Sequence, residues 1–89
     1  MGATNIHYEI ARLDRSPRKC YEDLVEEARY EYGNNCYSGT IATTSGFFMV
    51  DKPEDDDKYE QVLNSCDKWG KCACWIDGDR YVFIGWAAI

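Results

Sequence analysis

The chain has 89 residues and a formal net charge of −6, and 15% of its residues are aromatic. This length predicts a single domain over residues 1–89, and so many large rings favour an ordered core that needs no metal or disulfide. The negative charge disfavours nucleic acid and anionic membranes as partners. No apolar run approaches the roughly 18 residues of a membrane-spanning helix.

The cysteine count and the N-terminus bear on the compartment. Five cysteines cannot all pair within one chain, and residues 1–6 lack the basic-then-apolar layout of a signal peptide. We therefore expect a cytoplasmic protein with free thiols and no cofactor.

The first third of the chain predicts a strand and then a helix. Apolar and polar residues alternate over residues 6–11, which is typical of a strand with one buried face. A helix then begins at Pro17, with Ser16 as its N-cap, and ends before Gly33. The apolar stripe of this helix contains Cys20, Leu24 and Ala28.

A second strand is predicted over residues 36–43, where β-branched and hydroxyl side chains are frequent. Gly39 within it indicates a bulge or a close backbone contact. The short apolar run over residues 47–50 either continues this strand or begins another.

The remaining residues predict a second helix and a hairpin. Apolar residues recur at helical spacing between residues 53 and 65, and Asp51 is a candidate N-cap. Residues 71–76 and 80–87 are strand-like, and Asp77-Gly78 between them indicates a type I′ turn. The continuous apolar run over residues 81–84 fits a strand that is buried on both faces.

These elements predict an α+β domain of the order β-α-β-α-β-β. We expect a small, mostly antiparallel sheet of about four strands with both helices on one face, because a short chain fills one helix-covered core more readily than two. The helices would pack through Leu24, Ala28, Val62 and Leu63. The uncovered face would carry His7, Glu9 and exposed aromatic residues, with Trp75 or Trp86 among them.

Three segments bear on origin: Tyr37-Ser38-Gly39-Thr40-Ile41-Ala42-Thr43-Thr44, Lys68-Trp69-Gly70 and Tyr81-Val82-Phe83-Ile84-Gly85-Trp86-Ala87. Together they resemble small uncharacterised proteins of bacteria, bacteriophages and other mobile elements. Those proteins carry a Gly-Thr-Ile-(Ser or Ala)-Thr-Thr segment after an acidic helix and end with Trp-Gly and then Gly-Trp. The resemblance covers roughly the last two-thirds of the chain and implies a small accessory protein of phage or mobile-element origin. It implies no reaction.

Two alternatives concern chemistry at cysteine, threonine and histidine side chains. A zinc- or ligand-binding site would use Cys36, Cys66, Cys72 and Cys74. Buried core thiols are the simpler interpretation, and the related proteins have Pro or Ala where this chain has Lys71-Cys72. A small enzyme would use Thr40, Cys36 or His7, provided that the fold brings a hydroxyl or thiol to the imidazole.

The acidic residues favour an interaction protein that is not an enzyme. If both helices lay on one face, their acids would form one negative surface for a basic patch of a host protein. Surface acids that only keep the protein soluble are the simpler interpretation. The candidate partner-binding residues are Glu22, Glu26, Glu27, Glu54, Asp55, Asp56, Asp57, Trp75 and Trp86.

Self-association is the last expectation. An apolar strand over residues 81–89 at a sheet edge would invite pairing, whereas the net charge resists it. We expect a monomer or a weak dimer.

Overall fold

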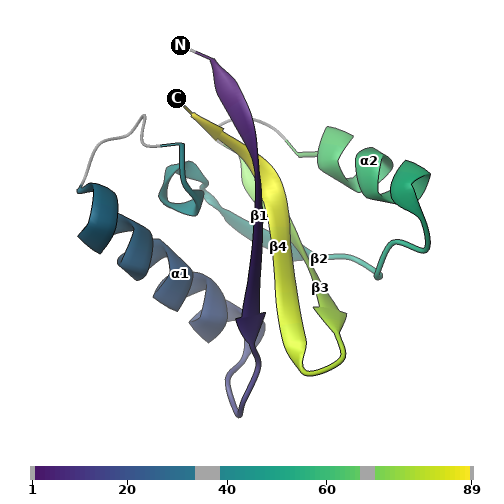
Figure 1. Ribbon diagram of the computed structural model, residues 1–89, viewed down its shortest axis with the longest axis horizontal. Helices are drawn as coiled ribbons and strands as arrows, with labels where there is room; N and C mark the ends of the chain where they lie inside the picture. Colours follow the sequence, from purple (N-terminus) through teal and green to yellow (C-terminus); the bar gives the residue numbers. More distant parts are fainter. Residues whose placement is uncertain (1, 34–38, 67–69, 89) are drawn as a thin grey trace.

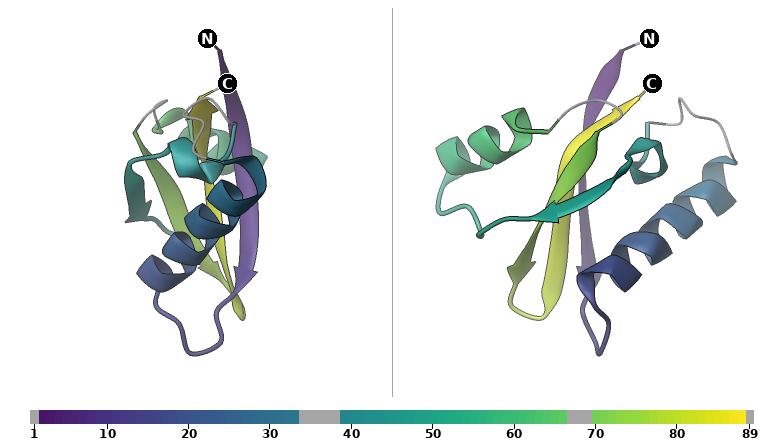
Figure 2. Two further views of the ribbon diagram at one scale, coloured as in Figure 1. Left: turned by 90° about the vertical axis from the view of Figure 1, so that its left-hand side faces the viewer. Right: turned by 180° about the vertical axis from the view of Figure 1, so that it is seen from behind.

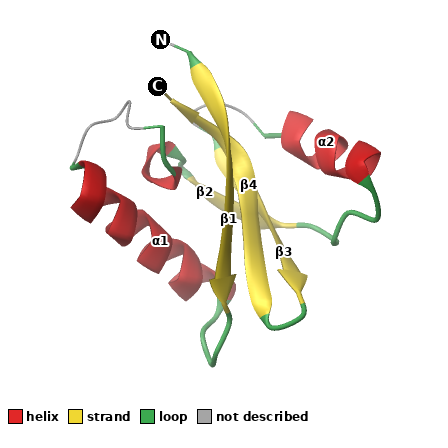
Figure 3. Ribbon diagram, in the orientation of Figure 1, coloured by secondary structure: helices red, strands yellow, loops and turns green. Residues whose placement is uncertain are grey.

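The computed structural model describes residues 2–33, 39–66 and 70–88 as one four-stranded sheet with a helix on each side (Figures 1 and 3). Its elements follow the expected order β-α-β-α-β-β, which confirms the α+β class. They are β1 (Ala3–Ala11), α1 (Pro17–Tyr32), the 3₁₀ helix η1 (Ile41–Thr43), β2 (Gly46–Met49), α2 (Asp56–Asn64), β3 (Lys71–Asp77) and β4 (Arg80–Ala88).

The strands lie in the order β1-β4-β3-β2. The central strand β4 is antiparallel to both of its neighbours, whereas β2 runs parallel to β3. The C-terminal strand is therefore not at an edge, because β1 covers one side of it and β3 the other, and the pairing considered for an edge strand over residues 81–89 does not arise. The edges are β1, which faces the viewer in Figure 1, and β2, which is in front when the molecule is seen from behind in Figure 2.

The expectation of both helices on one face is wrong. Successive residues of a strand point to opposite faces of the sheet. On β4, Phe83 packs in one cluster with Leu24 of α1, and Ile84 packs in another with Leu63 of α2. Figure 1 shows α1 and α2 on opposite sides of the strands. The physical reason is that β3 and β4 are apolar on both faces, so each face needs a cover.

The run over residues 81–84 is buried on both faces, as its sequence predicted. Residues 72–75 of β3 are equally buried, so the two central strands form the middle layer of a three-layer molecule. Neither helix among the described residues is long and apolar enough to cross a membrane.

Local signals at the helix ends are partly confirmed. Ser16 caps α1 by accepting a hydrogen bond from the Lys19 N–H, and Gly33 ends the helix. The second helix begins later than predicted, because Asp55 and not Asp51 is its N-cap. The Asp55 carboxylate accepts the Lys58 N–H at 2.8 Å.

The hairpin between β3 and β4 has the predicted place but a different turn. Asp77 pairs with Arg80, so the two loop residues are Gly78 and Asp79. Gly78 has φ +63° and Asp79 does not have a positive φ, which is the pattern of a type II′ turn and not of type I′.

The second predicted strand is wrong in its described part. Residues 41–43 form η1, which Thr40 caps, and residues 36–38 lie outside the described residues. The strand that follows η1 in the chain is β2. The apolar run over residues 47–50 therefore belongs to a new strand. Gly39, with φ +71°, makes a close backbone contact and not a bulge.

Candidate functional site

The threonine-rich segment 39–46 holds the end of β4. The Gly39 N–H donates to the Ala88 carbonyl at 2.8 Å, and the Ala88 N–H donates to Thr43 Oγ1 at 3.1 Å. The Thr43 hydroxyl in turn donates to the Thr40 carbonyl at 2.9 Å. Because Thr40 and Thr43 are buried and bonded to the protein's own backbone, their hydroxyls serve the fold.

We predict that Thr43→Val lowers the free energy of unfolding by about 1–3 kcal/mol, because it leaves the buried Ala88 N–H without an acceptor. Valine matches threonine in shape, so little packing is lost. Urea denaturation followed by circular dichroism measures the change. Thr4→Val on β1 is the matched control and should stay within about 0.5 kcal/mol. Equal losses in the two variants would contradict the role given to Thr43.

The described cysteines are buried. Burial raises the pKa of Cys72 and of Cys74 to about 12, so both stay protonated at neutral pH and are poor nucleophiles. Cys72 and Cys74 belong to the cluster under α1, whereas Cys66 belongs to the cluster under α2. Among the described residues no three ligating side chains form a metal-binding group, and Cys36 lies outside them.

The acidic candidates do not form one surface. Glu22, Glu26 and Glu27 lie on α1, and the other candidate acids, from Glu54 to Asp57, lie at the start of α2 on the opposite side of the sheet. The aromatic candidates are not on an open face either. Trp75 is only 4% exposed under α2, and the half-buried Trp86 donates its indole N–H to the Leu63 carbonyl at 3.1 Å.

The structure instead places the single histidine in a hydrogen-bonded group on the α2 side of the sheet. His7 Nε2 lies 3.1 Å from Glu9 Oε2, and His7 Nδ1 lies 3.0 Å from the Tyr59 hydroxyl. A carboxylate only accepts, so Nε2 carries the proton, and the hydroxyl donates to Nδ1 when the ring is neutral. Burial raises the pKa of Tyr59, which keeps that hydroxyl protonated. The Tyr59 ring packs edge-on against Trp75, with ring centres 5.9 Å apart.

Beside this group is a pocket of about 270 Å³, which we call the acidic pocket. Among the residues with a described position, five carboxylates line it, against one lysine. The Lys52 ammonium lies 2.9 Å from Asp77 Oδ1, and Glu9 lies 3.5 Å from an Arg80 nitrogen. The charged and aromatic lining residues are His7, Glu9, Lys52, Glu54, Asp55, Asp56, Tyr59, Trp75 and Asp77.

The carboxylates of the acidic pocket differ in the hydrogen-bond and ion-pair partners that they have. Asp55 caps α2, and Glu9 and Asp77 have cationic neighbours. Glu54 and Asp56 make no ion pair with any residue that the structure describes. The pocket therefore presents uncompensated negative charge beside the half-buried ring of Tyr59, behind which Trp75 packs, and this suits a cationic side chain.

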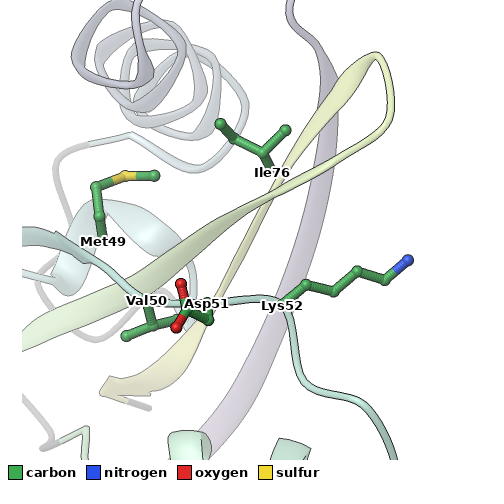
Figure 4. Close-up of a pocket in the computed structure, with 5 residues that line it drawn as sticks. All are labelled: Met49, Val50, Asp51, Lys52 and Ile76. Carbon is green, nitrogen blue, oxygen red and sulfur yellow. The ribbon is translucent and has the colours of Figure 1, made fainter.

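A second pocket of about 510 Å³ lies where β2 ends beside β3 (Figure 4). Met49 and Ile76 line it and are 47% and 45% exposed. Figure 4 shows their side chains on one side of β3, with the Lys52 side chain directed away from both. This pocket has an apolar rim but no group of polar side chains that converge on one point.

The arrangement offers little for the enzyme alternative. Both nitrogens of His7 have partners on the α2 side, and Thr40 caps η1, which packs with α1. The structure does not bring these two side chains together, and within the described ranges no serine, threonine or cysteine lines the acidic pocket. Sequence reasoning missed this pocket, since nothing in the spacing of His7, Glu9 and Tyr59 connects them.

The chain was compared with protein-family models, with curated proteins and with solved structures, and none of the three comparisons finds a match.

Proposed function

We propose that this protein is a small interaction module, not an enzyme, that binds a basic segment of a protein partner at the acidic pocket. One observation carries the proposal: of the residues that the structure describes, five carboxylates, the rings of Tyr59 and Trp75 and a single lysine line this cavity. An arginine or lysine side chain would gain a charge partner and an aromatic surface in the same place. Neither interaction requires a chemical reaction.

The proposal retains part of the sequence-based hypothesis and changes the rest. Glu54, Asp55 and Asp56 stay as partner-binding residues, and Trp75 joins them through the pocket lining. The resemblance to phage and mobile-element proteins supports an accessory role toward a basic host protein. The buried, reduced thiols fit a cytoplasmic setting.

The test uses a short peptide that contains two arginines and no acidic residue. It is titrated into the isotopically labelled protein at low and at moderate salt, with NMR shifts as the readout. We expect saturable shifts of the Trp75 indole and of the Tyr59 amide. The affinity should fall as salt rises, because the contact is between partly exposed charges.

Matched variants separate the acidic pocket from the overall charge. Glu54→Gln/Asp56→Asn should weaken peptide binding about three- to tenfold, since an exposed charge pair contributes roughly 0.2–1 kcal/mol. Glu26→Gln/Glu27→Gln on α1 removes the same charge from the opposite side and should leave the affinity within about twofold. The proposal fails if the two variants behave alike, or if the shifts map to α1.

A further inference from the structure

The two edges of the sheet are built differently. β2 is an edge strand of four residues, whereas β1 is an edge strand of nine residues with an unbroken register from Ala3 opposite Ala88 to Ala11 opposite Arg80. Proteins usually protect a long edge with a proline, a bulge or a covering element. β1 contains no proline and no bulge, so this edge is open.

The backbone groups at the open edge can be assigned from the pairing. The Arg12 N–H donates to the Asp79 carbonyl, which places even-numbered residues of this segment in hydrogen bonds with β4. Successive residues of a strand direct their backbone N–H and C=O groups to opposite sides. The N–H and C=O groups of odd-numbered residues of β1 therefore point outward, away from β4. The outward residues of β1 are Ala3, Asn5, His7, Glu9 and Ala11.

One end of this row is already occupied. The Ala11 carbonyl accepts a hydrogen bond from the Arg15 guanidinium. Among the other outward groups, the only internal contact in the described residues is a long one of 3.5 Å from the Thr4 hydroxyl to the Asn5 carbonyl. The groups available for a strand are therefore those of residues 3–9.

We propose that β1 pairs with β1 of a second copy of this chain, antiparallel and about a twofold axis, to form one continuous sheet across both copies. The open segment is complementary to itself. Ala11 takes no part, because its carbonyl is already bonded. The remaining outward residues form hydrogen-bonded pairs when Asn5 lies opposite the partner's His7 and Ala3 lies opposite the partner's Glu9. Each such pair exchanges two backbone hydrogen bonds.

Each chain carries a net charge of −6, so the overall charge opposes pairing, but the charges within the open strand do not. Glu9 is the charged residue of β1, and it lies beside His7 and Arg80 of its own chain. The proposed register sets the partner's Glu9 against Ala3, so no like charges lie directly opposite each other. The uncompensated acids Glu54 and Asp56 belong to the segment at the start of α2 and not to the strand itself, although they share the acidic pocket with His7 and Glu9.

The shape of the molecule sets which side carries the open edge. It measures 33 × 30 × 15 Å, and the view down its shortest axis has β1 at the front between α1 and α2 (Figure 1). The open edge therefore lies on one of the two broad sides. An ordinary interface buries about 800 Å² of each partner, so the helices that flank β1 on this side would have to contribute contacts beside the paired strands.

Sedimentation velocity of the full chain, over roughly two decades of concentration, tests the proposal. The mass should rise from 10.3 kDa toward twice that value. Asn5→Pro removes an outward N–H and leaves the bonds to β4 in place, so it should hold the protein at the single-chain mass. Asn5→Ala keeps the N–H and should behave as the wild type.

Amide exchange of the wild type gives an independent readout if Asn5→Pro does not fold. The outward amides of Asn5, His7 and Glu9 should exchange severalfold more slowly at high than at low concentration. The inward amides of Ile6 and Tyr8 should be protected throughout. A single-chain mass at every concentration, a folded Asn5→Pro variant that still dimerises, or concentration-independent exchange at residues 5, 7 and 9 would each overturn the proposal.

Salt distinguishes this contact from the acidic pocket. Two chains with net charge −6 repel each other, so added salt should strengthen the dimer. The same addition should weaken binding of the arginine peptide.

Discussion

Replacing Phe83 with alanine is expected to lower the free energy of unfolding by about 3–5 kcal/mol. Phe83 is 0% exposed at the centre of the cluster under α1. Its ring centre lies 6.0 Å from that of Tyr21 on α1 and 5.7 Å from that of Phe47 on β2. The side chain thus joins a central strand to a helix and to an edge strand. Its loss leaves a cavity that none of the three elements can close alone.

The measurement is urea unfolding, monitored by far-ultraviolet circular dichroism. Domains of this size are stable by roughly 5–15 kcal/mol, so the variant should remain folded or lie close to its unfolding midpoint in water. Phe83→Leu fills most of the volume and should lose less than about 1.5 kcal/mol. Tyr30→Ala removes a ring that is 91% exposed and should change little. A small loss in Phe83→Ala would mean that the core packs differently.

Gly85→Ala is expected to destabilise the protein by about 1–3 kcal/mol through overpacking. An added Cβ would lie 2.9 Å from Cys72 Cβ and 3.2 Å from Cys72 Cα. The second of these atoms belongs to the backbone of β3 and cannot rotate away. Gly85 does not have a positive φ, so the cost comes from contact and not from backbone strain.

The same unfolding experiment measures this loss, and the m-value should stay constant if only the native state changes. Gly2→Ala, at an exposed position before β1, is the control and should stay within about 0.5 kcal/mol. A Gly85→Ala variant as stable as this control would show that β3 and β4 can separate to admit a methyl group.

Local signals predicted several elements because their causes lie within a few residues. Ser16 accepts a hydrogen bond from an N–H three residues later, and Gly33 ends the same helix. The hairpin after Asp77 depends on adjacent residues as well. The run over residues 81–84 is apolar at every position, and its burial on both faces follows directly.

The failures occur where distant residues compete with local preference. The β-branched Ile41 and Thr43 favour a strand, yet they form η1, because Thr43 and Gly39 make hydrogen bonds to the backbone at the end of β4. That strand is far away in sequence. The acidic pocket also depends on residues far apart in the sequence. His7 and Glu9 belong to β1, and they meet Tyr59 only because α2 packs on that face of the sheet.

The sequence by itself determined the class of the fold, the order of its elements, the ends of α1 and the apolar character of both faces of β4. These depend on caps, periodicity and burial, which act over a few residues. Only the tertiary structure decided which face each helix covers, which strands stand at the edges and which charges meet. A helix on either face of the sheet satisfies the same local pattern. The two helices cover opposite faces because β3 and β4 are apolar on both faces, and each face has to be buried away from water.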